Sequence, residues 1–310
     1  MSVCVVGSIA FDSIETPFGK RERALGGTAV HFALAASFFT DVRLVGVVGE
    51  DFSAEELHLL ESRGIDLRDV ERVDGGKTFF WRGRYGYDLN VAETLETQLN
   101  VFAQFAPRLS AASKRARTLF LGNIQPGLQR AVRAQCTGAR LVALDSMNYW
   151  IESARDELVR AISEIDCLLL NDAEARQLTQ QPNLVRAART IRSWGPRTVV
   201  TKLGEYGAYL FGEHGFFGLP GYPLEDARDP TGAGDTFAGG FLGYLAARGE
   251  EEPTDDALRC AMTYGSVIAS FNVEGLGTER VQSLSREEIE ERFAQFRRFT
   301  HFEPIPEAAR

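Results

Sequence analysis

The chain has 310 residues, 44% of them hydrophobic, which is enough for one large α/β domain or two smaller ones with a substantial core. Its formal net charge of -9 argues against nucleic acid or an anionic membrane as the main partner. The four cysteines form no C-x-x-C pair and the four histidines show no metal spacing, so a structural zinc site is not expected. The first residues read as a strand and not as a signal peptide, and no apolar run approaches the ~18 residues of a membrane span. We therefore expect a cytoplasmic protein with reduced thiols.

The first elements combine a strand, an acidic residue and a glycine pair. Residues 3–9 are a short apolar run, which is typical of a buried parallel strand. Asp12 follows directly, at the place where α/β proteins put groups that bind ligands. Gly26 and Gly27 then precede a helix predicted over 28–39, and paired glycines allow the backbone to approach a ligand closely.

The next segment contains a second strand, a helix and an aromatic β region. Residues 42–48 predict a buried strand, a helix is expected over 52–63, and β segments are expected at 70–73 and 77–85. The last of these is rich in aromatic residues. Exposed aromatics on such a segment usually indicate substrate stacking or a dimer interface, although a hairpin packed on the core would also explain them.

After residue 100 the pattern becomes strand, helix, strand. Buried strands are expected at 119–121, 141–144, 167–170 and 198–202, with helices at 126–136, 151–163, 257–272 and 285–298. Repeated βα units predict an α/β fold, with a doubly wound, mostly parallel sheet and helices on both faces. Residues 299–310 are expected to fray.

Two polar motifs follow these strands. Asn171 and Glu174 read as a helix start resembling a capping box, and their oxygen atoms also suit a hydrated hard cation. Lys202, Gly204 and Gly207 form a Lys-x-Gly-x-x-Gly turn, which by itself predicts only a hairpin.

Residues 229–241 read Asp-Pro-Thr-Gly-Ala-Gly-Asp-Thr-Phe-Ala-Gly-Gly-Phe, a glycine-rich turn that runs into a predicted helix. A helix start leaves N–H groups unpaired and the helix dipole adds positive charge, so residues 232–234 are a candidate phosphate site. Asp235 lies at the same helix start and can accept a proton from a hydroxyl. An anion site beside a base is the minimum needed to move a phosphoryl group onto an alcohol. On these residues alone, a flexible turn with an Asp N-cap is an equal alternative.

The whole string closely resembles the C-terminal signature of the ribokinase-like (PfkB) carbohydrate kinases. The second signature of this family is built around a Gly-Gly pair, which Gly26 and Gly27 match. The resemblance covers about residues 3–298. It implies one ribokinase-like kinase domain over residues 1–310, with a small β-sheet lid formed by segments about 11–20 and 70–100.

The resemblance also implies roles at the acceptor side of the site. Asp235 would be the catalytic base, and the N–H groups of Gly232, Ala233 and Gly234 would hold the transferring phosphoryl group. The acceptor-binding positions would be Asp12, Gly26, Gly27 and His31. Many relatives have Asn in place of His31, facing the sugar. His31 therefore either reads a different substrate or is a satisfied core histidine.

Further positions are implied to bind the nucleotide and ions. The nucleotide-binding residues would be Lys202, Gly204, Gly207, Thr231 and Asn272. Asn171 and Glu174 would hold Mg²⁺ through water. Asp229 lies where relatives bind a monovalent cation such as K⁺. Asp145 ends one predicted strand, but the residues after it depart from the family's Asp-Pro-Asn-x-Arg pattern, so no role is carried over.

The sequence thus predicts an ATP-dependent kinase that phosphorylates a hydroxyl of a sugar or sugar-like molecule. A nucleoside kinase of the same family, with its acceptor stacked on Phe79 or Trp81, remains open. So does a catalytically idle protein that binds nucleotide or sugar, although the intact Asp235 argues against it. The apolar segment 77–87 predicts a homodimer in which two lids pair, and Phe79→Asp should weaken it.

Overall fold

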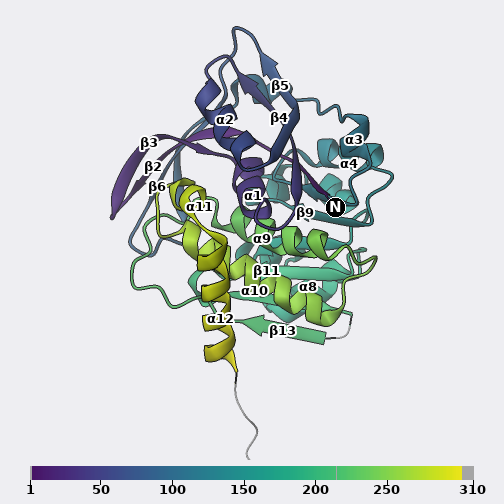
Figure 1. Ribbon diagram of the computed structural model, residues 1–310. Helices are drawn as coiled ribbons and strands as arrows, with labels where there is room; N and C mark the ends of the chain where they lie inside the picture. Colours follow the sequence, from purple (N-terminus) through teal and green to yellow (C-terminus); the bar gives the residue numbers. More distant parts are fainter. Residues whose placement is uncertain (1, 214, 302–310) are drawn as a thin grey trace, which may run out of the picture.

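The computed structural model describes residues 2–213 and 215–301. Within them the strands form a nine-stranded sheet and a separate four-stranded sheet that projects beside it (Figure 1). The larger sheet contains, in spatial order, β13 (Gly215–Leu219), β12 (Ala208–Gly212), β11 (Thr198–Lys202), β10 (Cys167–Asn171), β9 (Leu141–Asp145), β8 (Thr118–Leu121), β1 (Ser2–Val6), β4 (Asp41–Gly49) and β5 (Ile65–Val73). Its pairs are parallel from β11 to β5 and antiparallel from β11 to β13. The predicted doubly wound α/β sheet is confirmed.

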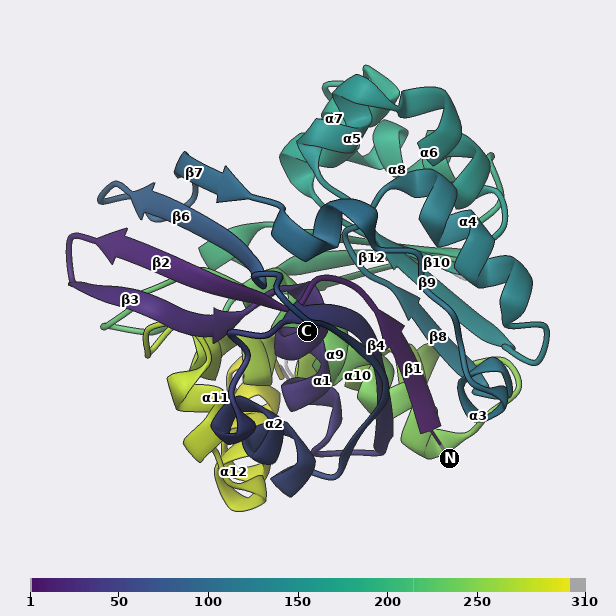
Figure 2. The same ribbon diagram turned by 90° about the horizontal axis from the view of Figure 1, so that it is seen from above.

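Helices cover both faces of the larger sheet (Figure 2). One layer contains α1 (Thr28–Ala36), α2 (Ala54–Ser62), α9 (Ala233–Arg248), α10 (Asp255–Asn272), α11 (Glu279–Ser283) and α12 (Arg286–Thr300). The other contains α4 (Pro126–Gln135), α5 (Asn148–Ser153), α6 (Arg155–Ile162), α7 (Asp172–Thr179) and α8 (Leu184–Arg192). Alternate residues of a strand pack into opposite layers: Val3 and Val5 contact the first, and Cys4 and Val6 the second. Strands buried on both faces therefore read as continuous apolar runs.

Short elements complete the connections: α3 (Ala111–Lys114), η1 (Asn100–Gln104) and η2 (Gly204–Tyr206). Among the described residues, no helix is long and apolar enough to span a bilayer. Two predicted helices differ from the structure, since the first ends at Ala36 and the segment 151–163 is divided between α5 and α6 at Ala154, whose φ is -144°. Helix α12 continues to Thr300, and residues 302–310 of the expected frayed end lie outside the described residues.

The smaller sheet has the order β3 (Gly19–Gly26), β2 (Ala10–Thr16), β6 (Phe79–Tyr85), β7 (Ala92–Gln98). It therefore includes β3, which the predicted lid segments missed. The predicted strand at 70–73 is instead the end of β5, which pairs with β4 at the edge of the larger sheet. Asp12 also lies inside β2 and not directly after β1, because β1 ends at Val6.

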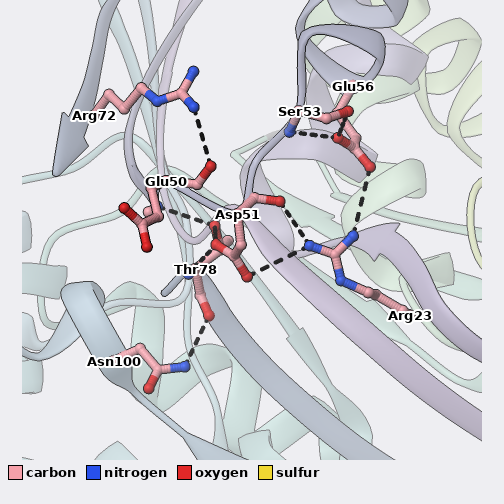
Figure 3. Close-up of polar contacts among 9 residues, drawn as sticks. Arg23, Glu50, Asp51, Ser53, Glu56, Arg72, Thr78 and Asn100 are labelled. Atoms are coloured by element: carbon pink, nitrogen blue, oxygen red, sulfur yellow. Dashed lines mark hydrogen bonds and ion pairs between the residues drawn. The ribbon is translucent and has the colours of Figure 1, made fainter. Parts of the chain in front are cut away.

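Polar contacts fasten the smaller sheet to the segment after β4 (Figure 3). The carboxylate of Asp51 accepts the N–H and hydroxyl of Thr78, at 2.7 and 2.8 Å, just before β6. Arg23 of β3 donates to the carbonyl of Asp51 at 2.7 Å, and Asn100 donates to the carbonyl of Thr78 at 2.9 Å. Two strands of the sheet are thus anchored at one point.

The aromatic residues of β6 are supported within the chain. Phe79 stacks on Phe102, with ring centroids 5.4 Å apart, and Phe102 stacks on Phe105. Phe79 therefore packs within the chain, as expected for a hairpin packed on the core. On the neighbouring positions, Arg82 and Arg84 form ion pairs with glutamates of β2 and β7.

Candidate active site

Three adjacent parallel strands end in polar residues at the same edge of the larger sheet. Asp145 ends β9, Asn171 ends β10 and Lys202 ends β11. Ligands of open α/β sheets bind outside the carboxyl ends of the strands. The N-terminus of α9 also lies here, because Gly234 contacts Lys202: a Cβ on Gly234 would lie 2.9 Å from Nζ.

Residues 230–235 lead into the first turn of α9 and are called the anion turn below; they contain the phosphate site predicted at residues 232–234. Gly232 has a φ of 70° and precedes the helix. The N–H of Ala233 already donates to the carbonyl of Pro230 at 3.1 Å. Among the described residues, none accepts a hydrogen bond from the N–H of Gly232, Gly234 or Asp235. The N–H groups without a partner are therefore those of Gly232, Gly234 and Asp235. The sequence had predicted Ala233 in place of Asp235.

Asp235 is half-buried beside this turn. Burial raises its pKa to about 7, the nearby Asp145 carboxylate adds to the rise, and Lys202 and the Thr28 hydroxyl oppose it. A carboxyl group whose pKa lies close to the working pH is well suited to act as a general base.

Lys202 lies at the anion turn and not only in the nucleotide turn that the resemblance implied. Its Nζ donates to Asp145 Oδ2 at 2.7 Å, and 17% and 6% of the two side chains are exposed. Burial lowers the pKa of Lys202, but Asp145 and Glu174 more than offset this, so the pKa is raised. Lys202 is thus a fixed cation next to the free N–H groups, and Gly204 and Gly207 form the turn that follows.

Asn171 and Glu174 form the expected capping box, each side chain accepting the other residue's N–H at 2.8 Å. Burial and the Asp145 carboxylate raise the pKa of Glu174 to about 7, while Lys202 opposes the rise. Asp145, Glu174 and Asp235 face a single lysine, which leaves negative charge uncompensated. No three His, Cys, Asp or Glu side chains of the described residues could ligate one ion directly. A hydrated Mg²⁺, which binds proteins through one or two carboxylates and keeps its waters, fits this set.

The predicted acceptor residues lie where β2 meets the start of α1. The Asp12 carboxylate lies against Gly26 and accepts the N–H of Gly27. Burial raises the pKa of Asp12 to about 7, with further contributions from Asp229 and Asp235. Asp12 and Asp235 are therefore close enough for their charges to interact.

Three further predicted residues, His31, Asp229 and Asn272, are interior. His31 and Asn272 are 2% and 0% exposed and lie beneath the anion turn. Asp229 is fully buried, and it accepts the N–H groups of Thr231 and Gly277 at 2.9 and 2.6 Å.

Tyr85 of β6 is a site residue that the sequence did not single out. Its hydroxyl accepts a hydrogen bond from Thr231 Oγ1 at 3.2 Å, so the smaller sheet touches the anion turn. Burial raises the pKa of Tyr85 to about 12. Nothing in the sequence links residues 85 and 231. The role of Asp145 could not be predicted either, because it depends on Lys202, which is also distant in sequence.

Comparisons with known proteins identify the family of the chain. The model of the pfkB family carbohydrate kinases matches residues 119–279. A cytidine kinase of Thermococcus kodakarensis is 30% identical over 260 residues, which cover 81% of this chain and 91% of that protein. A nucleoside kinase of Methanothermobacter thermautotrophicus is 29% identical over 84% of this chain and 82% of that protein.

Solved structures share the fold. The nucleoside kinase of Burkholderia thailandensis in complex with inosine has a TM-score of 0.75 at 21% identity, covering 94% of this chain and 97% of that one. The ribokinase of Thermotoga maritima has a TM-score of 0.74 at 20% identity, covering 95% and 99%. With a family model that spans half of its length and a relative at 30% identity, the chain belongs to the PfkB family and is an ATP-dependent kinase of a sugar or sugar-like molecule.

Proposed function

We propose that this kinase phosphorylates a sugar hydroxyl of a nucleoside, within one domain that spans the chain. The observation that carries the proposal is the position of Trp81. Asp12 and Trp81 are register partners on β2 and β6, so their side chains lie on the same face of the smaller sheet. Tyr85 is four residues further along β6, so its side chain lies on the same face, and its hydroxyl contacts the anion turn.

The indole of Trp81 forms a fixed flat surface. Its benzene ring lies across Gly83, where a Cβ would be 2.0 Å from Cη2. Its Nε1 donates to Thr94 Oγ1 at 3.2 Å, which holds the ring in place. An aromatic ring held over the sheet, next to the residue whose carboxylate would bind the sugar, is suited to stacking on a nucleobase. The relatives named above as cytidine and nucleoside kinases support the same acceptor class.

In the proposed reaction, Asp235 accepts the proton of the acceptor hydroxyl and Asp12 orients the acceptor. The free N–H groups of Gly232 and Gly234 bind the phosphoryl oxygens, and Lys202 adds positive charge beside them. Asn171 and Glu174 would hold Mg²⁺, which supplies charge neutralisation on the phosphates of ATP when bound. The smaller sheet covers the site and excludes water, which would otherwise compete with the acceptor.

The test compares nucleosides, pentoses and hexoses in an ATP-consumption assay, with Trp81→Ala beside the parent. We expect kcat/KM for the preferred nucleoside to fall ~5- to 150-fold in Trp81→Ala, because stacking on one base contributes about 1–3 kcal/mol. Trp81→Phe, which keeps a flat ring, is the matched control. Efficient turnover of a free sugar with no turnover of any nucleoside would show that the acceptor is a sugar.

We expect kcat/KM to rise with pH through about 7 and then level, because Asp235 accepts a proton only when it is ionised and its pKa is raised to about 7. Asp12 titrates in the same range, so the profile of Asp12→Asn is the control. The rise should persist in Asp12→Asn, with a lower plateau. A rate that does not change between pH 5 and 8 would contradict a raised pKa of the base.

We also propose a monovalent cation site at Asp229. This carboxylate is fully buried, and no cationic side chain among the described residues pairs with it. A K⁺ ion there would compensate the charge and stabilise the loop at 272–277 beside the anion turn. We expect higher turnover in potassium than in sodium or choline salts at equal ionic strength. Equal rates in all three would contradict the site.

We propose a homodimer that forms through the smaller sheet. Its support is the exposed apolar side chains of this sheet and its loops: Phe18, Tyr87, Val91 and Leu95. Leu95 lines a hollow of about 210 Å³ with Ile14, Arg82 and Arg84. We expect a dimer by light scattering at micromolar concentration, weakened by Leu95→Asp. Phe79→Asp is a poorer test than the sequence suggested, because it also breaks the stack on Phe102. A monomeric parent would contradict the proposal.

A further inference from the structure

A buried network joins His31 of α1 to the anion turn. The Nδ1 atom of His31 lies 3.2 Å from Oδ1 of Asn272, the last residue of α10. The Nδ2 of Asn272 donates to the carbonyl of Thr231 at 2.8 Å, and its Oδ1 also accepts the hydroxyl of Thr236 at 3.1 Å. Three segments distant in sequence thus meet at one amide side chain.

The network determines which nitrogen of His31 carries the proton. Since Asn272 donates through Nδ2 to Thr231, its Oδ1 faces His31, and a carbonyl oxygen can only accept. Nδ1 of His31 must therefore carry the hydrogen. Burial lowers the pKa of His31 to about 4, so the ring is neutral at pH 7. Nε2 is buried and has no hydrogen-bond partner among the described residues.

The ring of His31 also supports Gly232 sterically. A Cβ on Gly232 would lie 2.2–2.3 Å from Cε1, Nδ1 and Nε2, which places the backbone of Gly232 directly on the ring face. The ring and Asn272 thus hold two consecutive residues, Thr231 and Gly232, that lead to the free N–H groups of the turn. Their position therefore depends on His31.

We propose that His31 is a positioning residue for phosphoryl transfer: through Asn272 and Gly232 it holds the anion turn in the conformation that binds the transferring group, and it does not bind the acceptor. This rests on the proposed function. It differs from both expectations drawn from the sequence, since the histidine neither reads the substrate nor serves only as core packing.

Two variants separate the hydrogen bond from the ring. His31→Phe keeps a ring on Gly232 but loses the donor, whereas His31→Asn keeps a donor at the position of Nδ1 and loses the ring. We expect His31→Phe to lower kcat ~10- to 100-fold, as displacement of catalytic groups by about 1 Å does, with the acceptor KM within ~2-fold of the parent. His31→Asn should retain more of kcat than His31→Phe.

A double-mutant cycle with Asn272→Leu tests the route of the effect. If His31 acts through Asn272, the double variant should lose no more kcat than the more damaged single variant. Melting temperatures show that each variant is folded at the assay temperature.

A rise of ~10-fold in acceptor KM with unchanged kcat would instead place His31 in the acceptor site. Unchanged kcat and KM in His31→Phe would also overturn the proposal. Absence of turnover in the parent protein, assayed in parallel with the same acceptors, would speak against the proposed function and not against His31.

Discussion

Asp235→Asn is expected to lower turnover at least ~100-fold, because general-base catalysis contributes typically 10²–10⁴-fold. The substitution keeps the shape of the side chain but cannot accept the proton of the acceptor hydroxyl. The fold should survive, since the variant removes a half-buried carboxyl group that lies near the Asp145 carboxylate. ATP affinity should hold or improve, because one negative charge facing the phosphates is gone.

The measurement pairs turnover with calorimetric ATP affinity for parent and variant. Glu291→Gln, which changes an exposed carboxyl group on α12, is the matched control and should change neither. A binding protein without catalysis would show no turnover in the parent and little change on substitution. If Asp235→Asn retained most of the parent's turnover, another residue would be the base.

Lys202→Met is expected to destabilise the protein by ~3–5 kcal/mol, the usual cost of removing one partner of a buried ion pair. Asp145, 4% exposed, would lose the cation that lies 2.7 Å away while the Glu174 carboxylate stays nearby. Turnover should fall as well, since the cation beside the anion turn is lost.

The double variant Asp145→Asn/Lys202→Met provides the control, because it removes both charges and leaves neither unpaired. Urea denaturation of the parent, both single variants and the double variant gives the free energies of unfolding. The double variant should be more stable than Lys202→Met alone. Equal stability of these two would mean that the ion pair does not compensate a buried charge.

Local signals in the sequence predicted much of the fold. The apolar runs of β9, β10 and β11 could be identified because strands buried on both faces are uniformly apolar. The Asn171–Glu174 capping box was also correctly predicted, since its partners are three residues apart. β5 was harder to place, because its sequence Ile-Asp-Leu-Arg-Asp-Val-Glu-Arg-Val is that of a polar edge strand and only pairing with β4 assigns it to the larger sheet.

Long-range contacts at the site could not be predicted in this way. The ion pair of Lys202 with Asp145 spans 57 residues and the contact of Tyr85 with Thr231 spans 146. Neither leaves a pattern of spacing in the sequence. The engagement of Ala233 N–H by Pro230 was missed for another reason: it depends on the backbone angles of the turn, which the residue types leave open.

The order β3-β2-β6-β7 gives the smaller sheet two free edges, and this has a consequence for aggregation. Free edge strands are templates on which other chains can add strands, and a sheet that projects from the body cannot hide them. Here β3 carries Lys20, Arg21, Glu22 and Arg23, and β7 carries Glu93 and Glu96, most of them exposed. An added strand would have to remove water from these charges, several of which already have partners within the chain. The sheet can therefore extend over the site without becoming a nucleus for fibrils.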